Sequence, residues 1–393
     1  MPGTNLTRAE AAERAKVVSV QSYRVELDLT EDPRTFRART TVAFTAEPGT
    51  STFIDAITAS VESVTLNRAS LDPAEVSDGE RIQLPGLAAQ NELVVESTMH
   101  YMNTGEGLHR FVDPADGQVY LYSQFEVADT RRMFPVFEQP DLKATFQFCV
   151  TAPAEWAVVS NQPSPEPVAV SEGVARWDFS PTPVMSCYVT ALIAGPYLST
   201  RDSLVSSDGR TVELGLYARR SLFEHMDAEE MFEVTKQGFE FFESQFDTPY
   251  PFEKYDQLFV PQFNAGAMEN AGAVTFVESY IFRSKPAQAL VERRAITVLH
   301  ELAHMWFGDL VTMRWWNDLW LNESFAEYMS TLACAQNTQY TNAWTTFVAG
   351  EKSWGYAQDQ LPTTHPIKAE IPDLEAVLVN FDGITYAKGA SVL

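Results

Sequence analysis

The spacing of apolar residues changes character near residue 200. Before that point, short runs either alternate apolar with polar residues or are rich in β-branched residues, and prolines and glycines separate them. Alternation with a period of two is typical of strands that bury one face, so these runs predict an antiparallel all-β domain, a sandwich or saddle of sheets. The clearest predicted strands are 22–30, 40–46, 92–98, 119–127, 144–151 and 187–193.

After residue 200 the pattern combines strand and helix periods. Strands are predicted at 211–217, 255–260 and 273–277, and long helices at 222–246 and 291–307. In the second helix Ile296, Leu299 and Leu302 recur at helical spacing, and no proline interrupts them. We therefore expect two domains, an N-terminal β domain over residues 1–200 and an α+β domain over residues 201–393.

The last twelve residues, 382–393, read as the opening of a helix. The pattern stops without a cap, which would leave carbonyl groups unpaired and an apolar face uncovered. We interpret the chain as the N-terminal part of a longer protein.

The composition limits the classes of partner. The chain has 28 Lys and Arg against 53 Asp and Glu, a formal net charge of −25, which argues against binding to nucleic acid or to an anionic membrane. No apolar run is long enough to span a bilayer, and the first twenty residues have no secretory core. Three cysteines without CxxC spacing indicate buried, reduced thiols. We expect a cytoplasmic protein, with a monomer as the working assumption.

Two histidines one helical turn apart carry the strongest chemical signal. His300 and His304 belong to the segment HELAH, and Glu323 follows after an eighteen-residue gap. Residues i and i+4 share one helix face, so both imidazoles can bind one ion. Two histidines and one carboxylate are a typical catalytic zinc set that keeps a fourth position open, and Glu301 is placed to act as general base.

Such a short pattern also arises by chance on a solvated helix. The run 315–321 (WWNDLWL) is too apolar for a solvated loop, and it should bring Glu323 into the interior. A buried carboxylate needs a partner, and a cation is the obvious one. These observations favour a zinc hydrolase.

The surroundings of this motif carry a family resemblance. The segment 266–270 (GAMEN), the HELAH motif, the gap to Glu323 and Tyr386 in ITYAKG together resemble the gluzincin aminopeptidases of the aminopeptidase N type, in a bacterial and cytosolic form. The resemblance covers nearly the whole chain. It implies an N-terminal β saddle followed by a thermolysin-like catalytic domain that is incomplete at its C-terminus, with one zinc ion per chain and peptides with a free N-terminus as substrates.

The resemblance also implies roles for individual residues. Glu269 would bind the substrate's α-ammonium group with help from Gln124 and Glu126, and Tyr386 would donate to the oxyanion. Gln124 and Glu126 could instead share a solvated strand face, and Tyr386 could be an ordinary core tyrosine. The remaining substrate-binding candidates are Gly266, Ala267, Met268 and Asn270.

Helical spacing adds one more carboxylate to the candidate site residues. Glu327 lies one turn after Glu323 and is a candidate to orient a ligating histidine, although a surface position is equally compatible with the pattern. His365 lies in a proline-rich loop, and we interpret it as structural.

The sequence therefore predicts a zinc metallo-aminopeptidase that releases N-terminal residues. Two alternatives stay open at this point. One is a zinc hydrolase of other specificity, an endopeptidase or an epoxide hydrolase. The other is a fragment that binds peptides without turning them over.

Overall fold

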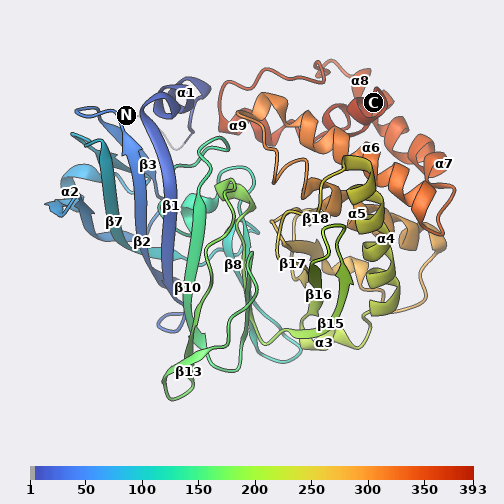
Figure 1. Ribbon diagram of the computed structural model, residues 1–393, viewed down its shortest axis with the longest axis horizontal. Coiled ribbons are helices and arrows are strands. Elements are labelled where there is room, and N and C mark those ends of the chain that lie inside the picture. The colour runs from blue at the N-terminus through green and yellow to red at the C-terminus, as the bar shows by residue number, and fades with distance from the viewer. Residues whose placement is uncertain (1–4) are drawn as a thin grey trace. The chain divides into compact units, whose positions relative to one another are not determined.

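The computed structural model describes residues 5–393, and the chain divides after Tyr197 into two compact units. The first unit is built mainly of strands, and the second combines a sheet with helices (Figure 1). This order, a β-rich part followed by an α+β part, confirms the predicted fold class.

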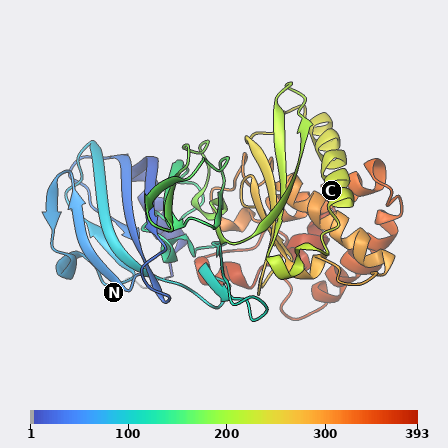
Figure 2. The same cartoon turned by 90° about the horizontal axis from the view of Figure 1, so that it is seen from below.

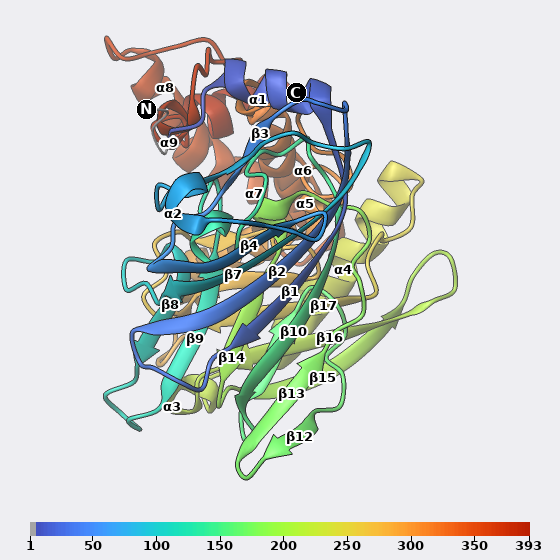
Figure 3. The same cartoon turned by 90° about the vertical axis from the view of Figure 1, so that its left-hand side faces the viewer.

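The first unit contains three sheets. An eight-stranded sheet has the order β12-β13-β10-β1-β2-β7-β4-β5, a four-stranded sheet the order β11-β14-β9-β8, and β3 pairs with β6. Figure 3 shows the long central strands of the largest sheet side by side. The strands are β1 (Val18–Asp28), β2 (Thr35–Ala46), β3 (Thr52–Asp55), β4 (Ser60–Leu66), β5 (Ala69–Leu71), β6 (Arg81–Leu84), β7 (Gln90–His100), β8 (Gly107–Val112), β9 (Val119–Gln124), β10 (Thr145–Pro153), β11 (Ala157–Ser160), β12 (Val168–Ser171), β13 (Val174–Asp178) and β14 (Leu192–Gly195).

Three details of this unit differ from the sequence prediction. The pairing of β1 with β10 is parallel, so the large sheet is not purely antiparallel. The predicted strand 187–193 begins as a 3₁₀ turn, Cys187–Val189, and β14 starts only at Leu192. The predicted strand 119–127 ends at Gln124. Apolar runs alone do not distinguish a strand from a buried turn, which explains the last two errors.

The second unit is a five-stranded sheet with helices. Its order is β15-β16-β17-β19-β18, and the elements are β15 (Leu198–Val205), β16 (Thr211–Ala218), β17 (Lys254–Val260), β18 (Ala267–Met268), β19 (Ala273–Val277), α3 (Arg220–Phe223), α4 (Ala228–Phe246), α5 (Gln288–His304), α6 (Trp320–Asn337), α7 (Ala343–Phe347), α8 (Ser353–Asp359) and α9 (Leu374–Leu378). Figure 2 shows α4 alongside this sheet. The predicted helix 222–246 is two helices, because residues 224–227 leave helical geometry between α3 and α4.

Close packing fixes α5 against α4. Gly238 of α4 faces Leu299 and Leu302 of α5, and a Cβ at residue 238 would lie 2.6 and 2.8 Å from their methyl carbons. The apolar residues that predicted α5 from the sequence are therefore the ones that bury it. Since α5 also carries HELAH, this contact positions the candidate site relative to the sheet.

Helix α1 (Arg8–Val17) docks on the first unit through polar groups. Arg14 is buried, and its guanidinium reaches Asp55 at 2.7 Å and Gln139 at 2.6 Å. Nearby, the backbone N–H of Arg131 donates to Glu138 at 2.7 Å. Burial raises the pKa of Glu138 to about 7, and the opposing influence of Arg131 only partly offsets it.

We expect Glu138 to make the first unit less stable as the pH rises from about 5 to 7. In this window the unfolded chain loses the Glu138 proton and the folded unit retains it, so the free energy of unfolding falls with rising pH. The shift from 4.5 to about 7 corresponds to about 3 kcal/mol. Urea unfolding of Glu138→Gln at pH 5 and pH 8 should show a correspondingly smaller pH dependence than wild type.

The matched control is Glu155→Gln, because Glu155 is exposed in a turn. This variant should keep the wild-type pH dependence. An unchanged pH dependence in Glu138→Gln would contradict the assignment.

Candidate active site

The two HELAH histidines and Glu323 converge in the second unit. His300 and His304 lie in the last two turns of α5, and their Nε2 atoms are 3.0 Å apart. Glu323 lies in the first turn of α6, with Oε2 at 3.3 Å from Nε2 of His300 and 3.4 Å from that of His304. All three side chains are buried, and their ligand atoms lie within 4.8 Å of one another.

This donor set fits a zinc ion. Two imidazoles and one carboxylate match the usual ligands of catalytic zinc, whereas calcium requires mainly oxygen donors. A buried carboxylate between two imidazoles also needs positive charge nearby. The nearby His304 and His300 hold the pKa of Glu323 down at about 2 even though burial alone would raise it, so this carboxylate is ionised at neutral pH.

The second nitrogen of each histidine has its own acceptor. Nδ1 of His304 donates to the Phe307 carbonyl at 3.0 Å, which leaves Nε2 free of a proton for a metal. Nδ1 of His300 lies 3.5 Å from Oε2 of Glu327, which is buried on α6. The structure thus brings the predicted Glu327 to the histidine, and α5 and α6 pack against each other (Figure 1).

A glycine makes room for the His304 ring. Gly308 has φ +143°, and a Cβ there would lie 3.2 Å from Nδ1 and 3.2 Å from the carbonyl oxygen of His304. Neither Gly308 nor the Phe307 carbonyl was predicted from the sequence. A glycine four residues after the second histidine was the available signal, but its meaning depends on backbone geometry that a single sequence does not display.

Glu301 is buried beside the ligands. Burial raises its pKa to about 8, the neighbouring imidazoles oppose that rise, and the Glu269 and Glu323 carboxylates add to it. A carboxyl group that shares a dry site with other acids and imidazoles can accept and return a proton near neutral pH. This is the property that a general base requires.

Glu269 reaches the same cluster from the sheet edge. It follows the two-residue strand β18, which pairs with β19 through Ala267 with Phe276 and Met268 with Thr275. Glu269 is 3% exposed, and its Oε1 has no hydrogen-bond partner among the described residues. Its ligand atom lies within 4.8 Å of those of Glu301 and His304. Burial raises its pKa, and the histidines oppose this shift. A cationic group of a ligand would satisfy this carboxylate.

The other residues of the GAMEN segment hold its backbone. Asn270 donates from Nδ2 to Thr275 Oγ1 at 3.2 Å, and its carbonyl accepts from Ala273 N–H at 2.9 Å. The Gly266 carbonyl accepts from the Val277 N–H at 3.0 Å. A Cβ at Gly266 would meet only the Tyr280 hydroxyl at 3.7 Å, so the fold itself does not require glycine at this position.

Tyr386 also lies at this cluster. It belongs to a single π-helical turn, η6 (Ile384–Lys388), and its ring centroid is 6.1 Å from that of His300 with an angle of 18° between the planes. The turn packs against α6, the helix of Glu323. The predicted helix over 382–393 is therefore much shorter than expected, but its tyrosine is brought to the histidine.

Gln124 and Glu126 belong to the first unit. Gln124 is the last residue of β9, opposite Gly107 of β8, and Glu126 lies beyond the strand. The prediction that both residues share one strand face is wrong, because the strand ends between them. Their role in substrate binding stays a prediction.

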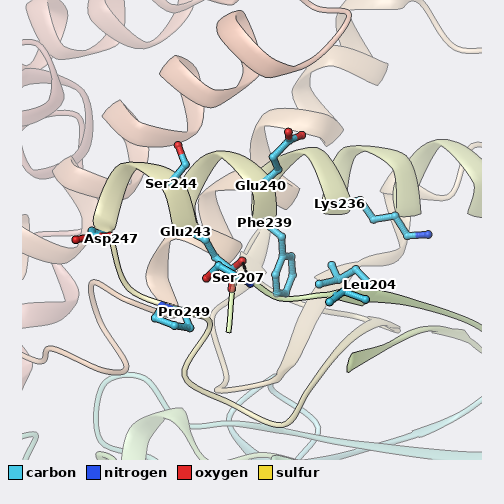
Figure 4. Close-up of a pocket in the computed structure, with 10 residues that line it drawn as sticks. Leu204, Ser207, Lys236, Phe239, Glu240, Glu243, Ser244, Asp247 and Pro249 are labelled. Atoms are coloured by element: carbon cyan, nitrogen blue, oxygen red, sulfur yellow. Dashed lines mark hydrogen bonds between the residues drawn. The ribbon is translucent and has the colours of Figure 1, made fainter. Parts of the chain in front are cut away.

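A hollow elsewhere in the second unit is separate from this cluster. It has a volume of about 610 Å³ and is lined by residues of α4 and the β15–β16 hairpin (Figure 4). Glu243 at its wall accepts hydrogen bonds from Ser206 Oγ, from Ser207 N–H at 2.7 Å and from Tyr250 N–H at 2.8 Å. Its carboxylate therefore holds the β15–β16 hairpin against α4. None of the candidate site residues lines the hollow.

No helix among residues 5–393 combines the length and the apolar character needed to cross a membrane. The three cysteines are free and buried, as the sequence predicted.

Comparison with known proteins gives two matching family models. The Peptidase M1 N-terminal domain matches residues 19–189, and the Peptidase family M1 domain matches residues 230–393. Aminopeptidase N of Streptomyces lividans is 60% identical over 100% of this chain and 46% of its own length. Tricorn protease-interacting factor F2 of Thermoplasma acidophilum is 32% identical over 86% of this chain and 42% of its own. Aminopeptidase N of Canis lupus familiaris is 36% identical over 70% of this chain and 29% of its own length. The chain thus spans about half or less of the length of these relatives.

We expect Gly308→Ala to weaken zinc binding by roughly 10- to 100-fold, the usual cost of disturbing a group that orients a ligand. The added methyl would press on the His304 ring and on the carbonyl oxygen of His304, so Nε2 would turn away from Glu323. Competition with a zinc chelator measures the effect. Gly350→Ala is the control, because a Cβ there meets nothing within 4 Å. Equal zinc affinity in both variants would rule out the steric role of Gly308.

Proposed function

This chain belongs to peptidase family M1, and we propose that it is the catalytic part of a zinc metallo-aminopeptidase that releases the N-terminal residue of peptides. The observation that supports this most directly is the convergence of His300, His304 and Glu323 with two more buried carboxylates, Glu301 and Glu269. A set of metal ligands beside a general base would explain hydrolysis of a peptide bond. A further carboxylate beside it explains the choice of a free N-terminus.

The proposed domains are residues 1–200, an N-terminal β domain, and residues 201–393, an incomplete thermolysin-like catalytic domain. The two compact units and the two family-model matches support this division. The further proposals are one zinc ion per chain, peptides with a free N-terminus as substrates, and a cytoplasmic monomer. The names of the relatives favour an aminopeptidase over an endopeptidase or an epoxide hydrolase.

In the proposed reaction, zinc held by His300, His304 and Glu323 would act as a Lewis acid that polarises the scissile carbonyl and acidifies water. Glu301 takes the proton of the attacking water and later returns it to the departing amine. Glu327 and the Phe307 carbonyl keep the imidazoles oriented through their Nδ1 atoms. The Tyr386 hydroxyl donates to the oxyanion, which exists only as the tetrahedral species forms.

Glu269 sets the register of the substrate in this proposal. Its unpartnered Oε1 accepts from the α-ammonium group, a charge-assisted hydrogen bond in a dry site. Gln124 and Glu126 of the first unit are proposed to help it. Gly266, Ala267, Met268 and Asn270 provide the backbone against which the first residue of the peptide lies. With the ammonium held, only the first peptide bond meets Glu301.

We expect Glu301→Gln to lower kcat by roughly 10²- to 10⁴-fold while the zinc content stays at the wild-type value, because the amide cannot accept the proton. Hydrolysis of a fluorogenic aminoacyl amide and elemental analysis of the purified protein measure the two quantities. Glu292→Gln, on the same buried helix, is the control and should keep its activity. Activity of Glu301→Gln within threefold of wild type would overturn the assignment of the base.

We expect Glu269→Gln to lower kcat/KM for a free-amine substrate by roughly 10- to 100-fold, the value of a hydrogen bond to a charged group. An N-acetylated substrate should be hydrolysed poorly by wild type and no worse by the variant, because it has no ammonium to lose. Equal cleavage of the free and blocked substrates by wild type would contradict the proposed role of Glu269 and favour an endopeptidase.

A further inference from the structure

The turn that carries Tyr386 is held by an aspartate cap. Oδ1 of Asp382 accepts from the N–H groups of Ile384 at 3.0 Å and Thr385 at 2.9 Å. The Asp382 carbonyl accepts from the Tyr386 N–H at 3.0 Å. A single helical turn has few internal hydrogen bonds, so the position of Tyr386 depends on this cap.

His365 fixes the orientation of the cap. Its Nε2 lies 2.9 Å from Oδ2 of Asp382, and its Nδ1 lies 2.8 Å from the carbonyl oxygen of Pro366. Both partners are acceptors only, since one is a carboxylate and the other a backbone carbonyl. The imidazole therefore lies between two acceptors and links the Asp382 carboxylate to the Pro366 carbonyl. The side chains of His365 and Asp382 are 22% and 18% exposed, so water screens the pair only in part.

A second carboxylate and a lysine lie near this pair. Lys388 of the same turn reaches Oδ1 of Asp359 at 2.7 Å, and Thr364 donates to that oxygen at 2.8 Å. Lys388 is the main cause that lowers the pKa of Asp359, and His365 contributes to it. Two carboxylates therefore lie at this turn: Asp382 is paired with His365, and Asp359 is paired with Lys388.

The opposite side of the turn is fastened to α6. Ser324, the residue after Glu323, donates from Oγ to the Thr385 carbonyl at 2.5 Å. A Cβ at Gly389 would collide with that Oγ, so the chain approaches α6 as closely as a glycine allows. On the side away from α6, the Gly383 N–H donates to Oε1 of Gln358, a backbone contact that does not involve the Asp382 carboxylate. That carboxylate is held at both oxygens, at Oδ1 by the N–H groups of Ile384 and Thr385 and at Oδ2 by His365.

We propose that His365 is a positioning residue: through Asp382 it sets the place of the Tyr386 hydroxyl relative to His300. This inference rests on the proposed function for its catalytic meaning, but its structural part does not. His365 acts on the turn by holding the cap. The sequence predicted a structural role for His365, and this proposal adds the turn of Tyr386 as the part of the site on which it acts.

Hydrogen exchange tests the structural part without any activity measurement. In His365→Ala, amides in a peptide covering 382–389 should exchange roughly tenfold faster, because the cap loses its partner. Exchange in α5 should not change. His365→Gln, which places an N–H near the former Nε2, should restore most of the protection, whereas His365→Asn should not. His225→Ala is the matched control, since His225 lies 3.7 Å from Glu224 elsewhere in the unit.

Unchanged exchange at 382–389 in His365→Ala would overturn the proposal even if the protein is an active aminopeptidase. Conversely, if the protein has no peptidase activity but the variant still exchanges faster, the proposed function is refuted and the positioning of the turn by His365 is supported.

Kinetics tests the catalytic part. His365→Ala should lower kcat roughly tenfold with KM within about twofold, because Tyr386 acts on the transition state. In a Tyr386→Phe background the same change should have no further effect on kcat, since the hydroxyl that it positions is gone. An additive loss in the double variant would show that His365 acts by another route and would overturn the proposal. Zinc content should be unchanged in every variant.

Discussion

The second unit is organised around a cluster of like charges buried at one point. Glu269, Glu301 and Glu323 share a site with His300 and His304, away from water. Three ionised carboxylates cannot coexist there without positive charge, because each has lost its hydration and repels the others. The pKa values of two of these carboxyl groups differ widely. Glu323 lies between the imidazoles and has a pKa of about 2, whereas burial raises the pKa of Glu301 to about 8. This difference matches the roles proposed for them, Glu323 as a metal ligand and Glu301 as the proton acceptor.

The sequence predicted the cluster because its parts lie on regular elements. Residues i and i+4 of a helix always share a face, so HELAH needed only the helix to be present, and the apolar spacing of α5 supplied that. Glu323 followed from its distance after HELAH and from the apolar run before it, and Glu327 followed from helical spacing one turn after Glu323. The order of a β-rich part and an α+β part followed from the change of period near residue 200. Such inferences succeed where one periodicity governs many residues.

The errors have a common physical cause, which is that backbone geometry at the ends of elements is set by tertiary contacts. The strand that was to present Gln124 and Glu126 together ends between them. The break between α3 and α4 and the short turn at Tyr386 belong to the same class. Gly308 acts through its backbone φ of +143°, and Phe307 acts through its backbone carbonyl oxygen. Neither feature can be predicted from the pattern of polar and apolar side chains. The role of His365 was not predicted because Asp382, its partner, is seventeen positions away.

Two adjacent residues of α6 connect the proposed metal ligands to Tyr386, the proposed oxyanion donor. Glu323 points to the imidazoles, and Ser324 binds the turn of Tyr386, so any shift of the first turn of α6 would move both. Glu269 depends instead on a two-residue strand at the sheet edge, which forms two residue pairs with β19. A helix transmits displacement rigidly, and a short edge strand does not. The fold therefore couples the proposed ligand Glu323 tightly to Tyr386, the proposed oxyanion donor, whereas the position of Glu269 depends on the edge of the sheet.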